Sequence, residues 1–171
     1  FAGYPPALYE KGLKIVTVQD RYYFPTVLRP GIKSTSFQKS ILIKMQAQQE
    51  GANDAVMVDG HGYITEGTTS NIFIVKKGRL ITPLPEVGIL EGITRRTVME
   101  LAGDRGIPVR EAHFFRKELY RADECFLTNT SLEIMPVVDI DRHSVGSGHP
   151  GILTILLMKA FREAIKKTIR D

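Results

Sequence analysis

Cysteine is almost absent from this chain, because Cys125 is the one cysteine in 171 residues. An internal disulfide requires two cysteines and a cysteine-rich metal site requires more, so both are excluded. So little cysteine is typical of a cytosolic protein, or of one that is indifferent to oxidation. We therefore expect a cytoplasmic protein without a disulfide framework.

Long apolar segments and metal-binding patterns are lacking too. The longest apolar run, residues 152–158, is interrupted by Thr154 and falls far short of the roughly 20 residues that a membrane span requires. The net charge of +4 comes from basic residues spread along the chain, without a dense basic run. The histidines share no metal-ligand spacing and are expected at the surface; they are His61, His113, His143 and His149. We expect no membrane, nucleic-acid or metal partner.

The first residues indicate a piece of a longer protein. The chain opens Phe1-Ala-Gly-Tyr-Pro-Pro without a methionine, as a processed product or a fragment does. Two prolines and two tyrosines within residues 1–10 are typical of a linker that enters a domain. With 43% hydrophobic and 25% charged residues, the chain as a whole has the composition of an ordinary globular domain.

Strand and helix patterns alternate along the rest of the chain. Branched and aromatic residues bounded by turn signals predict strands at 13–23, 54–58, 63–67, 71–76, 79–82, 108–111, 124–127 and 133–140. Helical spacing predicts helices at 37–50, 94–105 and from 152 onward, with a helical turn at 116–120. The strands before residue 83 form hairpins, one of them turning at Lys77-Gly78. We therefore expect an α+β fold with a mixed, largely antiparallel sheet flanked by helices.

Four stretches could bind a ligand through their own chemistry. Gly92-Ile93-Thr94 opens a helix, where free N–H groups and a hydroxyl favour phosphate, unless Thr94 only caps the helix. Glu66 ends a strand beside hydroxyl residues that could hold its carboxylate ionised, unless it is a turn residue. Lys33 would be a nucleophile if its pKa were lowered, and otherwise an ordinary solvated lysine. The hydroxyl-rich turn at 128–131 is a second anion candidate, or simply turn chemistry.

Taken in order, these stretches resemble the class IV aminotransferases. These are the fold-type IV pyridoxal 5′-phosphate enzymes, which include branched-chain and D-amino-acid aminotransferases and aminodeoxychorismate lyase. The resemblance lies in E-G-T-T-S-N-I-F at 66–73, L-I-T at 80–82, L-E-G-I-T-R at 90–95, A-D-E-C-F-L-T-N-T at 122–130 and G-S-G-H-P-G at 146–151. It implies that residues 13–171 form the cofactor-binding C-terminal domain, whose sheet curls into a pseudo-barrel.

The resemblance also implies roles for individual residues. Lys33 is similar to the lysine that binds the cofactor aldehyde covalently and shuttles a proton, and Glu66 to the acid that keeps the pyridine nitrogen protonated. Leu90 matches the apolar residue under the ring, and Tyr63 a tyrosine that reaches the cofactor phenolate. The residues that match contacts to the phosphate or the substrate carboxylate are Gly92, Ile93, Thr94, Asn129, Thr130 and Ser131.

Three departures leave the reaction open. Residues 34–37 read Ser-Thr-Ser-Phe where branched-chain enzymes usually have G-G-N-Y, and Ile152 stands where many members of the family carry proline. The stretch T-N-T-S-L-E-I-M-P at 128–136 looks at least as much like the lyase or D-amino-acid branch. The first expectation is transamination of branched-chain amino acids with 2-oxoglutarate. The alternatives are aminodeoxychorismate lyase, D-amino-acid aminotransferase and an inactive structural fragment.

Part of the family's active site has no counterpart in this sequence. The family's N-terminal domain supplies an arginine to the phosphate and most of the substrate pocket, partly across a dimer interface. Residues 1–12 match only the tail of that domain and the linker. The resemblance therefore implies amino acid and 2-oxo acid substrates, and a homodimer or higher homo-oligomer whose complete site needs more than this chain.

Overall fold

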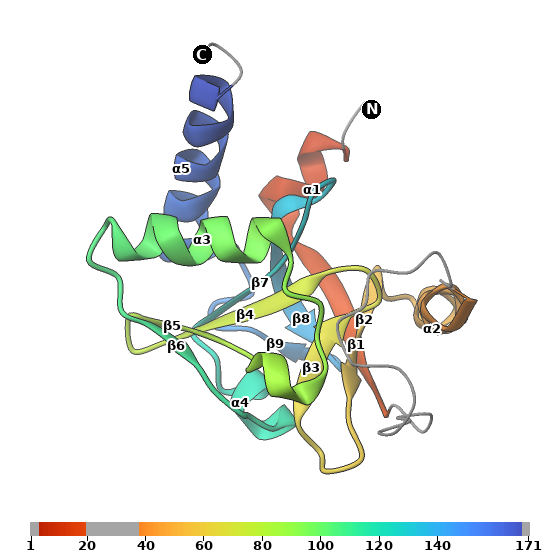
Figure 1. Ribbon diagram of the computed structural model, residues 1–171. Helices are drawn as coiled ribbons and strands as arrows, with labels where there is room; N and C mark the ends of the chain where they lie inside the picture. Colours follow the sequence, from red (N-terminus) through yellow and green to blue (C-terminus); the bar gives the residue numbers. More distant parts are fainter. Residues whose placement is uncertain (1–3, 20–37, 169–171) are drawn as a thin grey trace.

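The computed structural model describes residues 4–19 and 38–168, and Figure 1 shows their arrangement. The helices are α1 (Pro6–Lys11), α2 (Gln38–Gln49), α3 (Ile93–Gly103), α4 (Arg116–Tyr120) and α5 (Ile152–Thr168), with a 3-10 turn η1 (Pro85–Val87). The strands are β1 (Leu13–Gln19), β2 (Asp54–Val58), β3 (Ile64–Gly67), β4 (Asn71–Lys76), β5 (Arg79–Thr82), β6 (Val109–Glu111), β7 (Glu124–Asn129), β8 (Glu133–Ile140) and β9 (His143–Ser144).

All the strands join one mixed, curled sheet in the order β3-β2-β1-β8-β7-β4-β5-β6, with β9 paired to β8. The hairpins β2–β3, β4–β5 and β7–β8 are antiparallel, as is the β4–β7 pair. The pairs β1–β2, β1–β8 and β5–β6 are parallel. The predicted α+β fold with a mixed, largely antiparallel sheet is confirmed.

Two apolar layers lie on opposite faces of the sheet because side chains alternate along each strand. In β7, Cys125 and Leu127 enter one layer and Phe126 enters the other. The second layer is covered by α3 and α5, and Figure 1 shows α3 running across the upper edge of the sheet with α5 rising behind it. Phe126 stacks on Phe73 of β4 there, with ring centroids 5.0 Å apart. The β4–β7 pair is therefore buried on both faces of the sheet.

The predicted turn at Lys77-Gly78 is confirmed and explains the β4–β5 hairpin. Lys77 has φ 51° and Gly78 has φ 72°, so two consecutive residues lie in the left-handed region. That pair of conformations matches the twist of the flanking strands and is the usual two-residue hairpin turn. The turn is held by Asp123, whose carboxylate accepts from the Lys77 N–H at 2.6 Å and from Lys76 Nζ at 2.9 Å.

Helix α5 buries the face that its spacing predicts. Leu157, Ala160 and Phe161 are buried against the sheet, and Leu153 is partly buried there. The start of the helix is held by Glu124 of β7, whose carboxylate accepts from the Leu153 N–H at 3.0 Å. It also accepts from the Thr154 N–H and hydroxyl, each at 2.7 Å. A side chain from the sheet thus caps this helix.

Several sequence-based boundaries are wrong. The expected linker at 1–10 contains α1, which begins at Pro6 because proline suits the first turn of a helix. The helix expected from Thr94 to Arg105 runs from Ile93 to Gly103, and the strand expected to end at residue 127 continues to Asn129. The two-residue β9 was not predicted, since so short a strand has no periodicity. Residues 20–23 of the first predicted strand lie outside the described residues.

No helix within the described ranges is long and apolar enough to cross a bilayer. All four histidines are exposed, as the sequence predicts. The side chain of Cys125 is 1% exposed in the apolar layer, and burial raises the pKa of its thiol. This thiol therefore packs as a small apolar group.

The packing of α5 yields a matched pair of substitutions. Leu157 is fully buried, whereas its neighbour Leu156 is 41% exposed. We expect Leu157→Ala to lower the free energy of unfolding by about 2–5 kcal/mol, since it leaves a cavity between α5 and the sheet. Leu156→Ala should cost less than about 1 kcal/mol. Urea unfolding followed by circular dichroism measures both, and equal losses would contradict the burial of one face.

Candidate functional site

The carboxylate of Glu66 lies at the end of β3 and is largely withdrawn from water. Burial raises its pKa from 4.5 to about 7, while the hydrogen bond from Leu90 and the positive charge of Lys39 on α2 act in the opposite direction. The Leu90 N–H donates to Glu66 Oε2 at 3.0 Å. Within the described part of the chain this is the one hydrogen bond recorded for the carboxylate. A basic group of a ligand would stabilise the ionised form.

The strand end that carries Glu66 is fixed by buried polar contacts. Thr68 donates its hydroxyl to Asp54 Oδ1 at 2.6 Å, and Asp54 is 2% exposed at the start of β2. Lys44 of α2 lies 3.6 Å from the other oxygen of Asp54. The Gly67 N–H donates to the Ser70 carbonyl at 2.6 Å and closes the turn into β4. Glu66 therefore lies in β3, just before this turn, and the alternative that it is a turn residue is wrong.

Helix α3 begins at Ile93 without a side-chain cap. Its N-cap residue is Gly92, in an extended conformation, and no side-chain hydrogen bond closes the helix start. The alternative that Thr94 caps the helix is wrong, since Thr94 is the second residue inside it. The first N–H groups of a helix have no partner within the helix and attract anions. Thr94 is 6% exposed and Ile93 is 72% exposed, so the two amides lie at the border between core and solvent.

The predicted turn at 128–131 is organised around the Asn129 side chain. Its Oδ1 accepts from the Ser131 N–H at 2.8 Å and from the Leu132 N–H at 2.6 Å. Its Nδ2 donates to the Thr69 carbonyl at 3.0 Å. Asn129 thus shapes the turn and ties it to the turn after Glu66, whereas Thr130 and Ser131 are exposed.

The structure brings these three stretches to one end of the β4–β7 pair. Asn71, the first residue of β4, is opposite Thr128 near the end of β7. Its amide Nδ2 donates to the Leu90 carbonyl at 2.7 Å, just before α3. The contacts of Glu66 with Leu90 and of Asn129 with Thr69 close the ring of stretches. A ligand with a basic group and an anionic group matches this combination of a carboxylate and open helix amides.

Among the predicted site residues that the structure describes, Tyr63 has no recorded hydrogen bond to this ring. Tyr63 stacks on His113 and Phe115, with ring centroids 4.4 Å and 4.8 Å apart, and no recorded hydrogen bond links it to Glu66 within the described ranges. Lys33, the predicted nucleophile, lies outside the described residues.

Sequence reasoning missed several polar residues that build the site from behind. Arg95 is 3% exposed and donates from Nη2 to the Pro83 carbonyl at 2.9 Å and to Glu111. Thr82 is fully buried and donates its hydroxyl to the Ile72 carbonyl at 2.9 Å. Both residues, like Asn71, belong to the quoted motifs, which was the available signal. Thr82 thus links β5 to β4, and Arg95 links α3 to the segment after β5 and to β6.

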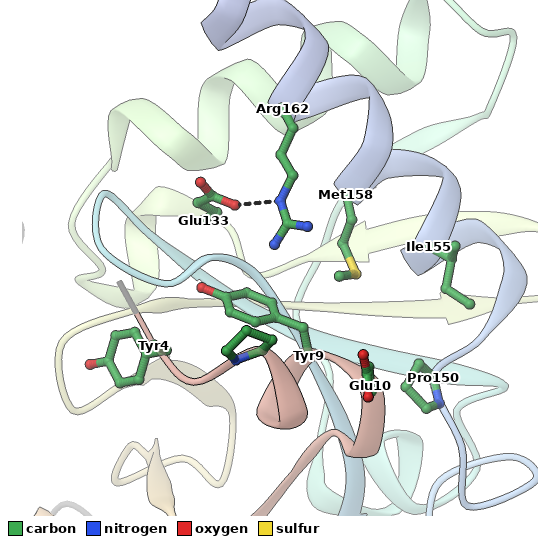
Figure 2. Close-up of a pocket in the computed structure, with 9 residues that line it drawn as sticks. Tyr4, Tyr9, Glu10, Glu133, Pro150, Ile155, Met158 and Arg162 are labelled. Carbon is green, nitrogen blue, oxygen red and sulfur yellow. Dashed lines mark hydrogen bonds and ion pairs between the residues drawn. The ribbon is translucent and has the colours of Figure 1, made fainter. Parts of the chain in front are cut away.

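A separate cleft of about 560 Å³ lies between α1 and α5, and Figure 2 shows its lining side chains. Arg162 of α5 donates from Nε to Glu133 Oε2 at 2.9 Å across it and lies 4.9 Å from the ring centre of Tyr9. Burial, and next the charge of Glu133, raise the pKa of Tyr9. None of the predicted site residues that the structure describes lines this cleft, so the cleft is separate from the predicted site.

Comparison with known proteins identifies the family. The amino-transferase class IV family matches residues 2–140. The chain belongs to this family. The fold of this class IV chain is shared with solved structures of branched-chain amino acid aminotransferases.

Three relatives illustrate the similarity of this class IV chain. A branched-chain-amino-acid aminotransferase of Salmonella typhimurium is 39% identical over 80% of this chain and 43% of its own length. A D-alanine aminotransferase of Bacillus licheniformis is 35% identical over 91% of this chain and 53% of its own. The structure of the Escherichia coli branched-chain amino acid aminotransferase has a TM-score of 0.90, 33% identity, and coverage of 95% and 54%. The chain spans about half the length of these relatives.

The raised pKa of Glu66 predicts a pH-dependent effect of Glu66→Gln. Because the folded pKa of about 7 exceeds the value of 4.5 without burial, ionising Glu66 costs stability as pH rises between these values. In cofactor-free protein, Glu66→Gln should change the free energy of unfolding little near about pH 4. By about pH 8 it should add on the order of 2 kcal/mol. Urea titrations across this range measure the difference, and one that does not vary with pH would contradict the assignment.

Proposed function

We propose that this chain forms the cofactor domain of a pyridoxal-5′-phosphate-dependent aminotransferase that exchanges amino groups between branched-chain amino acids and 2-oxoglutarate. The observation that carries the proposal is the link between a buried carboxylate and an open helix start through the single residue Leu90. Pyridoxal phosphate carries a basic ring nitrogen and a phosphate. Residues 13–171 would hold it, and residues 1–12 would be the tail and linker of a preceding domain.

The residues present fit this group. Glu66 has its pKa raised to about 7 by burial, so it lacks the compensation that a protonated ring nitrogen would provide. The backbone N–H of Ile93 and the N–H and hydroxyl of Thr94 would bind the phosphate, with Gly92 leading into them. Thr130, exposed on a turn tied to the same end of the sheet, would add a second phosphate contact. Leu90 would support the ring.

The protein's own groups would manage protons and orientation. The chemistry that bound pyridoxal phosphate supplies is that of an electron sink for the substrate Cα. Glu66 would keep a proton on the ring nitrogen, which strengthens that sink. Lys33, placed here by its position in the family motif, would move a proton to and from the substrate Cα. Tyr63, Asn129 and Ser131 are proposed at the edge of the site, with Thr130 and Ser131 toward the substrate carboxylate.

The choice of substrate follows the names of the relatives. The Salmonella relative is named a branched-chain-amino-acid aminotransferase, which favours that reaction. The Bacillus relative is named a D-alanine aminotransferase, so D-amino acids are the second candidate. We further propose a cytoplasmic homodimer or higher homo-oligomer, in which the part of the relatives' length beyond this chain completes the pocket.

A coupled assay on the full-length protein discriminates these reactions. We expect glutamate to form from 2-oxoglutarate with L-leucine, L-isoleucine or L-valine, and not with D-alanine. Glutamate from D-alanine alone would favour the second candidate. Pyruvate released from aminodeoxychorismate without glutamate would indicate the lyase reaction. The inactive-fragment alternative concerns this chain alone, and tight cofactor binding with substrate turnover by purified residues 1–171 would refute it.

Covalent trapping tests Lys33 independently of turnover. Borohydride reduction of the full-length protein with pyridoxal phosphate should fix the cofactor to the peptide that contains Lys33, because an amine and an aldehyde combine reversibly there. Mass spectrometry should find no label in Lys33→Ala and full label in the control Lys159→Ala, which changes an exposed lysine of α5. Equal labelling of both variants would remove Lys33 from its proposed role.

A further inference from the structure

The backbone of Leu90 is held through the two consecutive peptide groups that meet at this residue. Its N–H donates to Glu66 Oε2 at 3.0 Å, and its carbonyl accepts from Asn71 Nδ2 at 2.7 Å. A peptide unit is planar, so fixing the carbonyl restricts the direction of the chain into residues 91 and 92. The two side chains therefore position the segment that leads from the Glu66 carboxylate to the first amides of α3.

Asn71 is itself immobilised. It is 5% exposed and begins β4, where it pairs with Thr128 of β7. The next residues of β4, Ile72 and Phe73, are fully buried on opposite faces of the sheet. A side chain anchored in this way can impose a position on a loop, whereas a side chain on a mobile turn cannot.

The absence of a side chain at Gly92 lets the side-chain amide of Asn71 reach residues 90–92. A Cβ at Gly92 would lie 2.4 Å from Asn71 Oδ1, far inside contact distance. The backbone of Gly92 has φ −62° and ψ 142°, a conformation open to any residue. Glycine is therefore required at this position for the approach of Asn71 and not for the backbone angle. The motif positions 71 and 92 form one contact.

We propose that Asn71 is a positioning residue for the cofactor site: its amide holds residues 90–92 so that the Leu90 N–H meets Glu66 while the open amides of α3 face the phosphate. Gly92 leaves the space that admits the amide. The inference rests on the proposed function in one respect, namely that Glu66 and α3 serve the same ligand. The coupling between Asn71, Leu90 and Glu66 is a property of the protein alone.

The first test measures Glu66 in the full-length protein freed of cofactor. Carboxyl ¹³C NMR titration should show that Asn71→Ala raises the pKa of Glu66 above its value of about 7, because the Leu90 N–H that stabilises the carboxylate is lost while burial remains. The charged group recorded as acting on Glu66, Lys39 of α2, is unchanged in the variant. A fall toward 4.5 would mean that the pocket had merely opened to water, and no change would mean that Asn71 does not act through Leu90. Either result overturns the proposal.

A double-mutant cycle tests the contact between positions 71 and 92. Calorimetry with pyridoxamine 5′-phosphate should show about a tenfold loss of affinity for Asn71→Ala and for Gly92→Ala, as expected for one displaced hydrogen-bonded contact. The double variant should bind no worse than the weaker single variant, because alanine at position 71 leaves room for the new Cβ. Losses that multiply to about a hundredfold would overturn the shared contact.

A control variant and two independent measurements separate failure of the proposed function from failure of the positioning role of Asn71. Asn53 makes one comparable side-chain bond, accepting from the Lys14 N–H at 2.8 Å, which links the segment before β2 to β1 and does not involve Leu90, so Asn53→Ala should change neither the Glu66 titration nor the affinity. If wild-type protein fails to bind pyridoxamine 5′-phosphate while Asn71→Ala still raises the Glu66 pKa, the proposed function fails and the positioning role stands. If wild-type protein binds pyridoxamine 5′-phosphate and Asn71→Ala leaves the pKa of Glu66 unchanged, the proposed function stands and the positioning role fails.

Discussion

A carboxylate that the fold keeps from water, stabilised by one peptide N–H, is the constraint on which the site depends. Glu66 holds a pKa near 7 because burial outweighs its hydrogen bond to Leu90. Because this burial outweighs both the hydrogen bond and the charge of Lys39, the ionised form would gain further from a basic group of a ligand. The surrounding structure keeps this state in place, since the turn after Glu66 is tied to β2, to β4 and to the turn after β7.

The family motifs of this chain contain residues that hold the structure together as well as residues proposed to bind the cofactor. Thr82 and Arg95 lie in the stretches that identify the family, yet each is buried and bonded to a backbone carbonyl of the scaffold. Asn71 lies in the same motif as Glu66 and reaches the loop before α3. Residues that hold strands and helix together therefore surround the few that would meet a ligand, because a ligand contact is only as precise as its support.

Local patterns predicted much of the fold. The hairpin at Lys77-Gly78 and the buried face of α5 follow from turn chemistry and from helical spacing, both of which are properties of neighbouring residues. The parallel pairing of β1 with β2 and β8 could not be predicted in the same way, since it joins segments far apart in the chain. Helix α1 was missed because proline and tyrosine suggest a linker until packing is known.

The same distinction applies to the site. Glu66, Leu90 and the start of α3 were predicted from the motif, and the structure places them together. The alternative of a cap at Thr94 failed because the helix already starts at Ile93, which makes Gly92 the N-cap residue, and boundaries are the weakest part of a sequence-based prediction. The contact of Asn71 with residues 90–92 spans about twenty residues of chain, and no local pattern reports it.

Helices α3 and α5 both begin near β7, yet their first amides differ in how far they are available to an anion. The first amides of α5 are already neutralised by the carboxylate of Glu124, and the Thr154 hydroxyl is turned to the same acceptor. The positive end of that helix is occupied within the protein, and a phosphate approaching it would meet a resident negative charge. Helix α3 has no such side-chain cap at its start. Of these two helix starts, the one of α5 is therefore occupied by a side chain of the protein itself, and the start of α3 is the one that a negatively charged ligand would meet without a competing carboxylate cap.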